Sequence, residues 1–211
     1  MEEERVDILN SKGKVIGQTT REEAIKKGEV IGAVSTFIVD KNGHILIEKR
    51  SEKAKHDAGM LDLVSGHITS GETPKEAAIR EIKEELGENT FSEAELNSIR
   101  EVATRRINFT EVGREGNYLV TLFLMKLDRI LTREMCDLQE DEVADIEHIP
   151  YELFEYIVQT RKSNVRIPYN KTTAEAMEMV KREIFDIRPQ RGNHSKKDEQ
   201  ESHEDSDIGD N

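Results

Sequence analysis

The segment from Gly66 to Gly87 constrains this chain most, because it combines a glycine-containing loop with a helix that has clear signals at both ends. Thr73 is a good N-cap, and Pro74 suits the first helical position, where its missing N–H is not needed. Glu76 lies three residues after Thr73, which completes a capping box. Gly87 suits a left-handed residue after the last turn. We therefore expect a helix between Pro74 and Gly87.

This helix has two distinct faces. Its aliphatic residues fall at helical spacing, at Ile79, Ile82 and Leu86. Such spacing predicts one face packed on the core. At about 100° per residue, Glu84 and Glu85 lie on either side of Glu81, roughly 120° from the apolar face. The helix should therefore pack on the core with one side and present carboxylates at its flank.

The three crowded acids point to a bound cation. Like-charge pairs at these spacings destabilise an exposed helix by a few tenths of a kcal/mol each. In a partly shielded cleft, two such charges about 4 Å apart repel by about 4 kcal/mol. A hard divalent cation reverses that sign, because carboxylate oxygens are its preferred ligands. The acids by themselves also fit a solvated helix face, and the loop ahead of them favours the metal site.

The spacing of the whole segment is specific. It reads Gly, five residues, Glu, seven residues, Arg-Glu, an aliphatic residue, any residue, Glu-Glu, any residue, Gly. This pattern resembles the Nudix box from Gly66 to Gly87 and departs only at Glu88, where that family usually has an aliphatic residue. The departure concerns a packing contact at the helix end rather than a metal ligand. The resemblance implies a Nudix-type α/β/α sandwich with a mixed β-sheet.

The resemblance also implies an activity and a set of site residues. Nudix hydrolases use Mg²⁺ or Mn²⁺ to cleave a nucleoside diphosphate linked to another moiety. Glu81, Glu84 and Glu85 match the positions that ligate the metal or serve as the base, and the Gly66 carbonyl matches a common backbone ligand. Arg80 matches the residue that orients a glutamate. A cation would neutralise the pyrophosphate oxygens and activate a water, whose proton a nearby carboxylate can take.

Acids outside the helix are further candidates. Glu72 matches the loop acid that lies near the metal and substrate. Some family members supply another glutamate from a later loop, and here Glu142 or Glu140 could do so from the acidic run at residues 139–142. Glu111 and Glu115 are weaker candidates for the same role. A solvated turn is the alternative for Glu142 and for Glu140, each taken singly.

Basic residues near the box could contact the substrate phosphates. Arg50 ends a predicted strand, and Arg105 and Arg106 lie on another strand with one facing each side. One of that pair could therefore reach the substrate while the other is solvated. Lys55 and His56 lie in a loop ahead of the box. A solvated surface charge is the alternative for each of them.

A second resemblance is to isopentenyl-diphosphate isomerases, which share the fold. It covers the hairpin entry, the strand at residues 30–39 and the Gly66-His67 pair. Those enzymes use a cysteine shortly before the Gly-His pair, where this chain has Val64 and Ser65, and Ile31 stands where a ligand histidine is expected. We therefore interpret the chain as a hydrolase of an isomerase-like branch. Isomerase activity and a non-catalytic Nudix-fold binding module are the alternatives.

Composition limits the partners. The chain has 211 residues with a net charge of −13, which opposes binding to duplex nucleic acid. No apolar run is long enough to span a membrane, and the acidic start at Glu2 is unlike a signal peptide. The single cysteine, Cys136, excludes an internal disulfide and suits a reducing cytoplasm. We expect a cytoplasmic protein, and family analogy suggests a homodimer.

The chain should form one Nudix domain over residues 1–187, with an N-terminal hairpin at 5–19, the box at 66–88 and C-terminal helices at 150–186. The tail at 188–211 is acidic and nearly without apolar residues, so it should be disordered. Strands are expected at 5–9, 15–19, 30–39, 44–49, 61–64, 98–109, 117–128 and 143–149. Further helices are expected at 20–27, 91–97, 151–161 and 173–185, the last with Thr172 and Glu175 at capping-box spacing.

Overall fold

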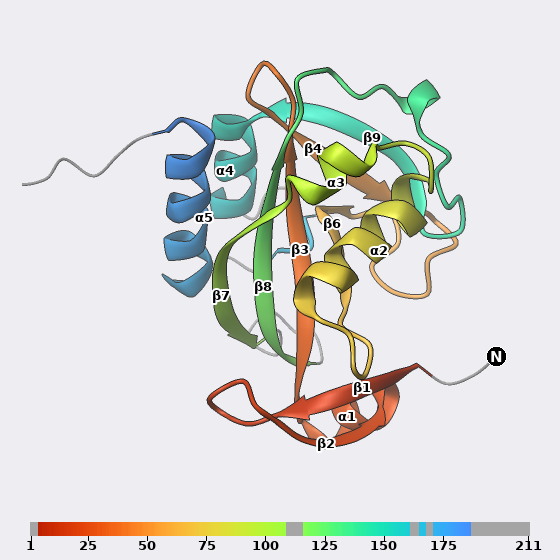
Figure 1. The fold of residues 1–211 in the computed structure, drawn as a ribbon, viewed down its shortest axis with the longest axis vertical. Helices are drawn as coiled ribbons and strands as arrows, with labels where there is room; N and C mark the ends of the chain where they lie inside the picture. The colour runs from red at the N-terminus through yellow and green to blue at the C-terminus, as the bar shows by residue number, and fades with distance from the viewer. Residues whose placement is uncertain (1–3, 109–115, 161–164, 168–170, 187–211) are drawn as a thin grey trace, which may run out of the picture.

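The computed structural model describes residues 4–108, 116–160, 165–167 and 171–186 (Figure 1). Its strands are β1 Arg5–Leu9, β2 Val15–Thr20, β3 Val30–Val39, β4 His44–Arg50, β5 Leu61–Asp62, β6 Val64–His67, β7 Arg100–Asn108, β8 Asn117–Lys126 and β9 Val143–Pro150. Its helices are α1 Arg21–Lys27, α2 Pro74–Leu86, α3 Glu93–Asn97, the 3-10 turn η2 Arg133–Met135, α4 Tyr151–Thr160 and α5 Lys171–Ile184. Glu111, Glu115 and the tail at 188–211 lie outside the described residues.

Strand β3 is the centre of a mixed sheet. It pairs with β8 in parallel over its whole length, from Val30 opposite Asn117 to Val39 opposite Lys126. Its pairs with β1, β4 and β6 are antiparallel, and β4 in turn pairs with β5 and β9. The β-branched, apolar sequence of β3 suits a strand covered on both faces.

Helices cover both faces of this sheet (Figure 1). Side chains of β3 alternate between two apolar clusters, with Phe37 and Val39 in one and Val34 and Ile38 in the other. The first cluster includes α4 and α5, and the second includes α2 and α3. The expected α/β/α sandwich with a mixed β-sheet is confirmed.

Helix α2, the helix of the box, begins as the local sequence signals predict, but it ends differently. The Thr73 hydroxyl accepts from the Glu76 N–H, and the Glu76 carboxylate accepts from the Thr73 N–H, which forms the capping box. Ile82 and Leu86 are fully buried. The prediction that Gly87 is left-handed helical is wrong: its φ of 105° and ψ of 137° lie outside that region, and a turn follows in which the Thr90 N–H donates to the Gly87 carbonyl oxygen. A glycine is still favoured there, because φ is positive.

Two element boundaries also differ from expectation. The strand expected at 61–64 divides into β5 and β6, because the Asp62 carboxylate accepts the Leu63 N–H and Leu63 turns into the core. The last helix begins at Lys171, so Thr172 lies inside its first turn and is not the N-cap. In the described residues, no helix is long and apolar enough to cross a membrane.

Candidate active site

Gly66 brings strand β6 against helix α2. It pairs with Val34 of β3, and a Cβ at this position would overlap the Glu81 carboxylate. The backbone of β6 therefore approaches the acidic side of α2 as closely as a glycine allows. The sequence prediction that Gly66 and Glu81 belong to one site agrees with this placement.

Arg80 organises the acids around that contact. Its Nη1 donates to Glu81 Oε1 at 2.7 Å and to Glu84 Oε2 at 2.9 Å. Its Nε donates to Glu72 Oε1 at 3.0 Å, and its Nη2 donates to the His67 carbonyl oxygen at 2.8 Å. The guanidinium thus ties the box loop to the helix and fixes the Glu81 carboxylate.

Burial and Arg80 act on Glu81 in opposite directions. The Glu81 side chain is 13% exposed, and burial raises its pKa to about 7 although Arg80 opposes the rise. Glu72 behaves differently: burial favours its neutral form, but bonds from Arg80 and Thr69 are stronger and lower its pKa. Without metal, the Glu81 carboxyl is therefore partly protonated near neutral pH, whereas Glu72 stays ionised.

Glu85 faces Glu48 of β4, an acid that sequence reasoning missed. Both are buried, and a side-chain hydrogen bond joins them. Burial raises the pKa of Glu48 to about 8, with Asp62 adding to the rise. Burial, and then Glu48, hold the pKa of Glu85 well above its usual range. Among the described residues, Glu48 Oε1 and Glu85 Oε2 have no hydrogen-bond partner.

The strand pattern carried a signal for Glu48. Side chains alternate along β4, and Ile45 and Ile47 join the cluster beneath α4 and α5, while Leu46 joins the cluster beneath α2. Glu48 falls on the Leu46 face. An acid on the inward face of a strand beside the box helix is a candidate site residue.

Arg50 and Glu142 meet on the same side of the site. Arg50 Nη2 donates to Glu142 Oε2 at 2.9 Å, and both residues line the cleft described below. Glu142, and not Glu140, therefore lines the same cleft as the box acids. Lys55 and His56 line this cleft as well.

The structure does not bring Arg105 or Arg106 to the site. The Arg105 guanidinium donates to Met179 Sδ of α5 at 3.2 Å, and Arg106 is exposed. Neither lines the cleft, and the expectation that one of them contacts the substrate is corrected. The two residues do face opposite sides of the strand, but α5 covers the Arg105 side.

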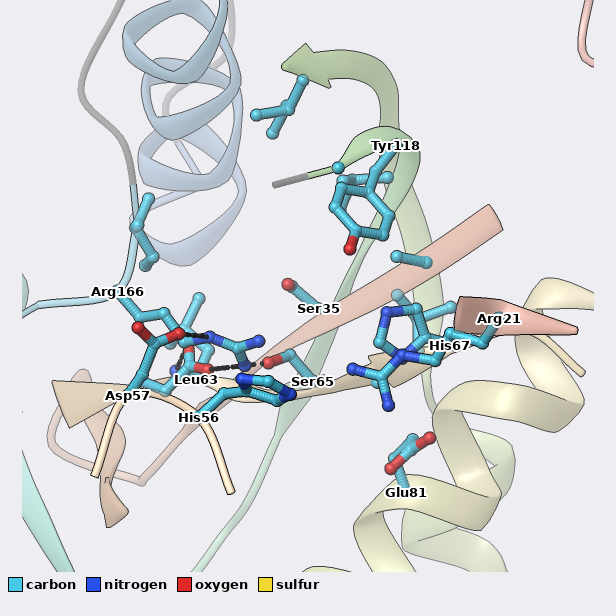
Figure 2. A pocket seen from close by; sticks show the side chains of 18 of the residues that line it. Arg21, Ser35, His56, Asp57, Leu63, Ser65, His67, Glu81, Tyr118 and Arg166 are labelled. Atoms are coloured by element: carbon cyan, nitrogen blue, oxygen red, sulfur yellow. Dashed lines mark hydrogen bonds and ion pairs between the residues drawn. The ribbon is translucent and has the colours of Figure 1, made fainter. Parts of the chain in front are cut away.

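The acids open onto a cleft of about 1600 Å³ (Figure 2). Its other wall contains Arg166, which donates to Asp57 at 2.9 Å and to Asp62 at 2.8 Å. The rings of His67 and Tyr118 lie with their centroids 5.5 Å apart and their planes inclined at 51°. Burial lowers the pKa of His67 to about 3, helped by nearby arginines, so the imidazole is neutral. The cleft thus places acids, cations and ring faces around one space.

Comparison with known proteins identifies the family. A family model described as the NUDIX domain matches residues 31–168, which is more than half of the chain. The chain belongs to the Nudix family. This finding agrees with the box spacing and with the sandwich of helices around a mixed sheet.

Similar proteins carry Nudix names. The chain is 28% identical to Nudix hydrolase 3 of Arabidopsis thaliana over 81% of its own length, but it spans only 22% of that protein. It is 30% identical to an uncharacterized Nudix hydrolase of Listeria innocua, covering 79% of this chain and 89% of the relative. A Deinococcus radiodurans crystal structure matches the fold with a TM-score of 0.60 at 20% identity, covering 83% of this chain and 99% of that one. The isomerase-like branch stays a prediction.

The box acids Glu81, Glu84 and Glu85 have side chains that suit a hard divalent cation. Their oxygens are the donors that Mg²⁺ and Mn²⁺ prefer, and one of these oxygens, Glu85 Oε2, is buried without a hydrogen-bond partner, as is Oε1 of the neighbouring Glu48. Within the described ranges, no group of three or more Asp, Glu, His or Cys side chains is already arranged to hold a metal ion. Arg80 explains part of this arrangement, because its guanidinium neutralises Glu81 and Glu84 at the position where the acids crowd.

Proposed function

We propose that this chain hydrolyses the pyrophosphate bond of a nucleoside diphosphate linked to another moiety, with Mg²⁺ or Mn²⁺ as its cofactor. The observation that carries this proposal is the pair of acids on α2, the partly buried Glu81 and the buried Glu85, which line the cleft beside Gly66. Buried carboxylates with raised pKa values are costly unless they serve a site. Family membership agrees with this chemistry.

The residues of the box have different roles in this proposal. Glu81, Glu84, Glu85 and the Gly66 carbonyl would hold the cation, which supplies charge neutralisation of the phosphates and a water of lowered pKa. Arg80 keeps the Glu81 carboxylate oriented through its bond of 2.7 Å. A carboxylate beside the cation can take the proton that the activated water releases.

Substrate contacts beyond the cation come from the cleft walls. Arg50 lines the cleft and is held by Glu142, so its guanidinium is oriented before a phosphate binds. Glu142 is the proposed additional catalytic acid, released from Arg50 when a substrate phosphate takes its place. Glu72 acts by holding Arg80, since its side chain does not line the cleft.

No observation favours isomerase activity. That reading needs a thiol near Gly66, but Ser65 there donates its hydroxyl to Asp62 at 3.0 Å. The only cysteine in the sequence, Cys136, is buried near Thr132 and does not line the cleft. Burial raises the pKa of its thiol to about 11. A thiolate nucleophile is therefore not available at neutral pH.

The test is a substrate panel with Mg²⁺ or Mn²⁺, covering nucleotide sugars, ADP-ribose, dinucleotide polyphosphates, NADH and isopentenyl diphosphate, with mass detection of both product halves. We expect hydrolysis of a nucleotide substrate only with metal, and a loss of about 100-fold in Glu85→Gln. Glu147→Gln, an exposed acid on β9, is the charge-matched control and should retain activity. Isomerised isopentenyl diphosphate, or ligand binding without turnover, would contradict the proposal.

A further inference from the structure

Glu48 belongs to strand β4 of the sheet and lies outside the box, yet it meets Glu85 of the box helix. Its residue is 2% exposed, and it lies on β4 directly opposite Asp62 of β5. Two acids paired across strands repel. Burying a carboxylate in this setting costs free energy unless a partner compensates for it.

The neighbouring cations do not provide that partner. Arg50, two residues along the same strand, donates its Nη2 to Glu142 and its Nε to the His56 carbonyl oxygen. Within the described residues, no Lys, Arg or His forms an ion pair with Glu48 or Glu85. Each of these two carboxyls instead keeps one buried oxygen without a hydrogen bond.

We propose that Glu48 is an additional carboxylate ligand of the divalent-cation site, acting from β4 opposite Glu85 of α2. The inference rests on the proposed metal-dependent function. A cation between sheet and helix would satisfy both orphaned oxygens and reverse the repulsion between the two acids. Such a ligand anchors the ion to the sheet as well as to the helix.

The competing explanation is a purely structural pair that shares one proton. In that case Glu48 stabilises the position of Glu85 but does not respond to metal. Glutamine separates the two explanations, because its amide keeps the size of the side chain and can still donate to the Glu85 carboxylate, while it removes one anionic ligand.

The test measures Mn²⁺ binding to the full chain by the loss of the free Mn²⁺ signal in electron paramagnetic resonance. Glu48→Gln should weaken Mn²⁺ binding about 10- to 100-fold, while the exposed control Glu147→Gln should bind like the wild type. Circular dichroism in EDTA confirms that each variant is folded. An affinity of Glu48→Gln within about twofold of the wild type overturns the inference.

Two further outcomes keep the conclusions separate. If the wild type binds no Mn²⁺, the proposed function itself fails, whereas equal binding by the wild type and Glu48→Gln removes only the role of Glu48. If Glu48→Gln does not fold, anomalous diffraction from wild-type crystals grown with Mn²⁺ decides. A Glu48 oxygen at about 2.0–2.2 Å from the ion supports the inference, and a Glu48 carboxyl outside the coordination shell overturns it.

Discussion

Replacing Glu81 with glutamine should change how the stability of the metal-free protein depends on pH. In the folded chain the pKa of Glu81 is raised from 4.5 to about 7. The stability associated with this group is therefore fully present below pH 4.5 and is lost as the pH rises through 7. Each tenfold change in an equilibrium constant is worth about 1.4 kcal/mol, so the loss is about 3 kcal/mol.

The assay is thermal unfolding by circular dichroism in EDTA at a series of pH values from about 5 to about 8. A change of about 3 kcal/mol corresponds to roughly 6–12 °C in Tm for a domain of this size. His67 acts in the opposite direction, because its pKa is lowered to about 3 and its stability contribution grows as the pH rises through 6.5. Only the difference between the wild type and Glu81→Gln therefore isolates Glu81.

We expect Glu81→Gln to gain about 2.5 kcal/mol relative to the wild type between pH 5 and pH 8, because part of the loss already occurs below pH 5, and we expect Mg²⁺ to reverse the loss in the wild type. Glu147→Gln should follow the wild-type curve, because its side chain is exposed on β9. If the stability of the wild type and of Glu81→Gln depends on pH in the same way over this range, the claim that burial raises the pKa of Glu81 is refuted.

Two other substitutions test the geometry. Gly66→Ala should weaken Mn²⁺ binding by about 10-fold or more in calorimetry, because the added Cβ displaces the Glu81 carboxylate; Gly17→Ala, whose Cβ would lie at an ordinary 3.6 Å from its nearest neighbour, should bind normally. Arg80→Ala should lower the free energy of unfolding in urea by about 2 kcal/mol, since it strands partly buried acids. Arg182→Ala removes only an exposed pair on α5 and should cost under about 0.5 kcal/mol; equal losses in the two arginine variants would contradict the organising role of Arg80.

The box helix was predictable because its signals are local. The capping box at Thr73 and Glu76, the Pro74 position and the aliphatic spacing all lie within a few turns of one another. The same locality explains the agreement on Gly66 and Glu81, since a fixed spacing joins them. The end of the helix was less predictable, because the conformation of Gly87 depends on the chain that follows it.

The rest of the site depends on contacts between distant segments. Arg166 reaches Asp62 across 104 positions of sequence, and no local pattern indicates that pairing. The alternation of side chains along β7 correctly predicts that Arg105 and Arg106 face opposite sides of the strand. Only the placement of α5 shows that the Arg105 side is covered. Glu48 had a local signal in its inward strand position, yet its meeting with Glu85 follows from how the sheet packs against α2.

The most direct measurement of the proposed chemistry is a calorimetric titration of the full chain with Mg²⁺ and Mn²⁺, comparing the wild type with Glu85→Gln. We expect saturable uptake by the wild type and an affinity at least about 10-fold lower in the variant. Heats of dilution from the wild type, or equal uptake by both proteins, would contradict a cation site built on the carboxylates of α2.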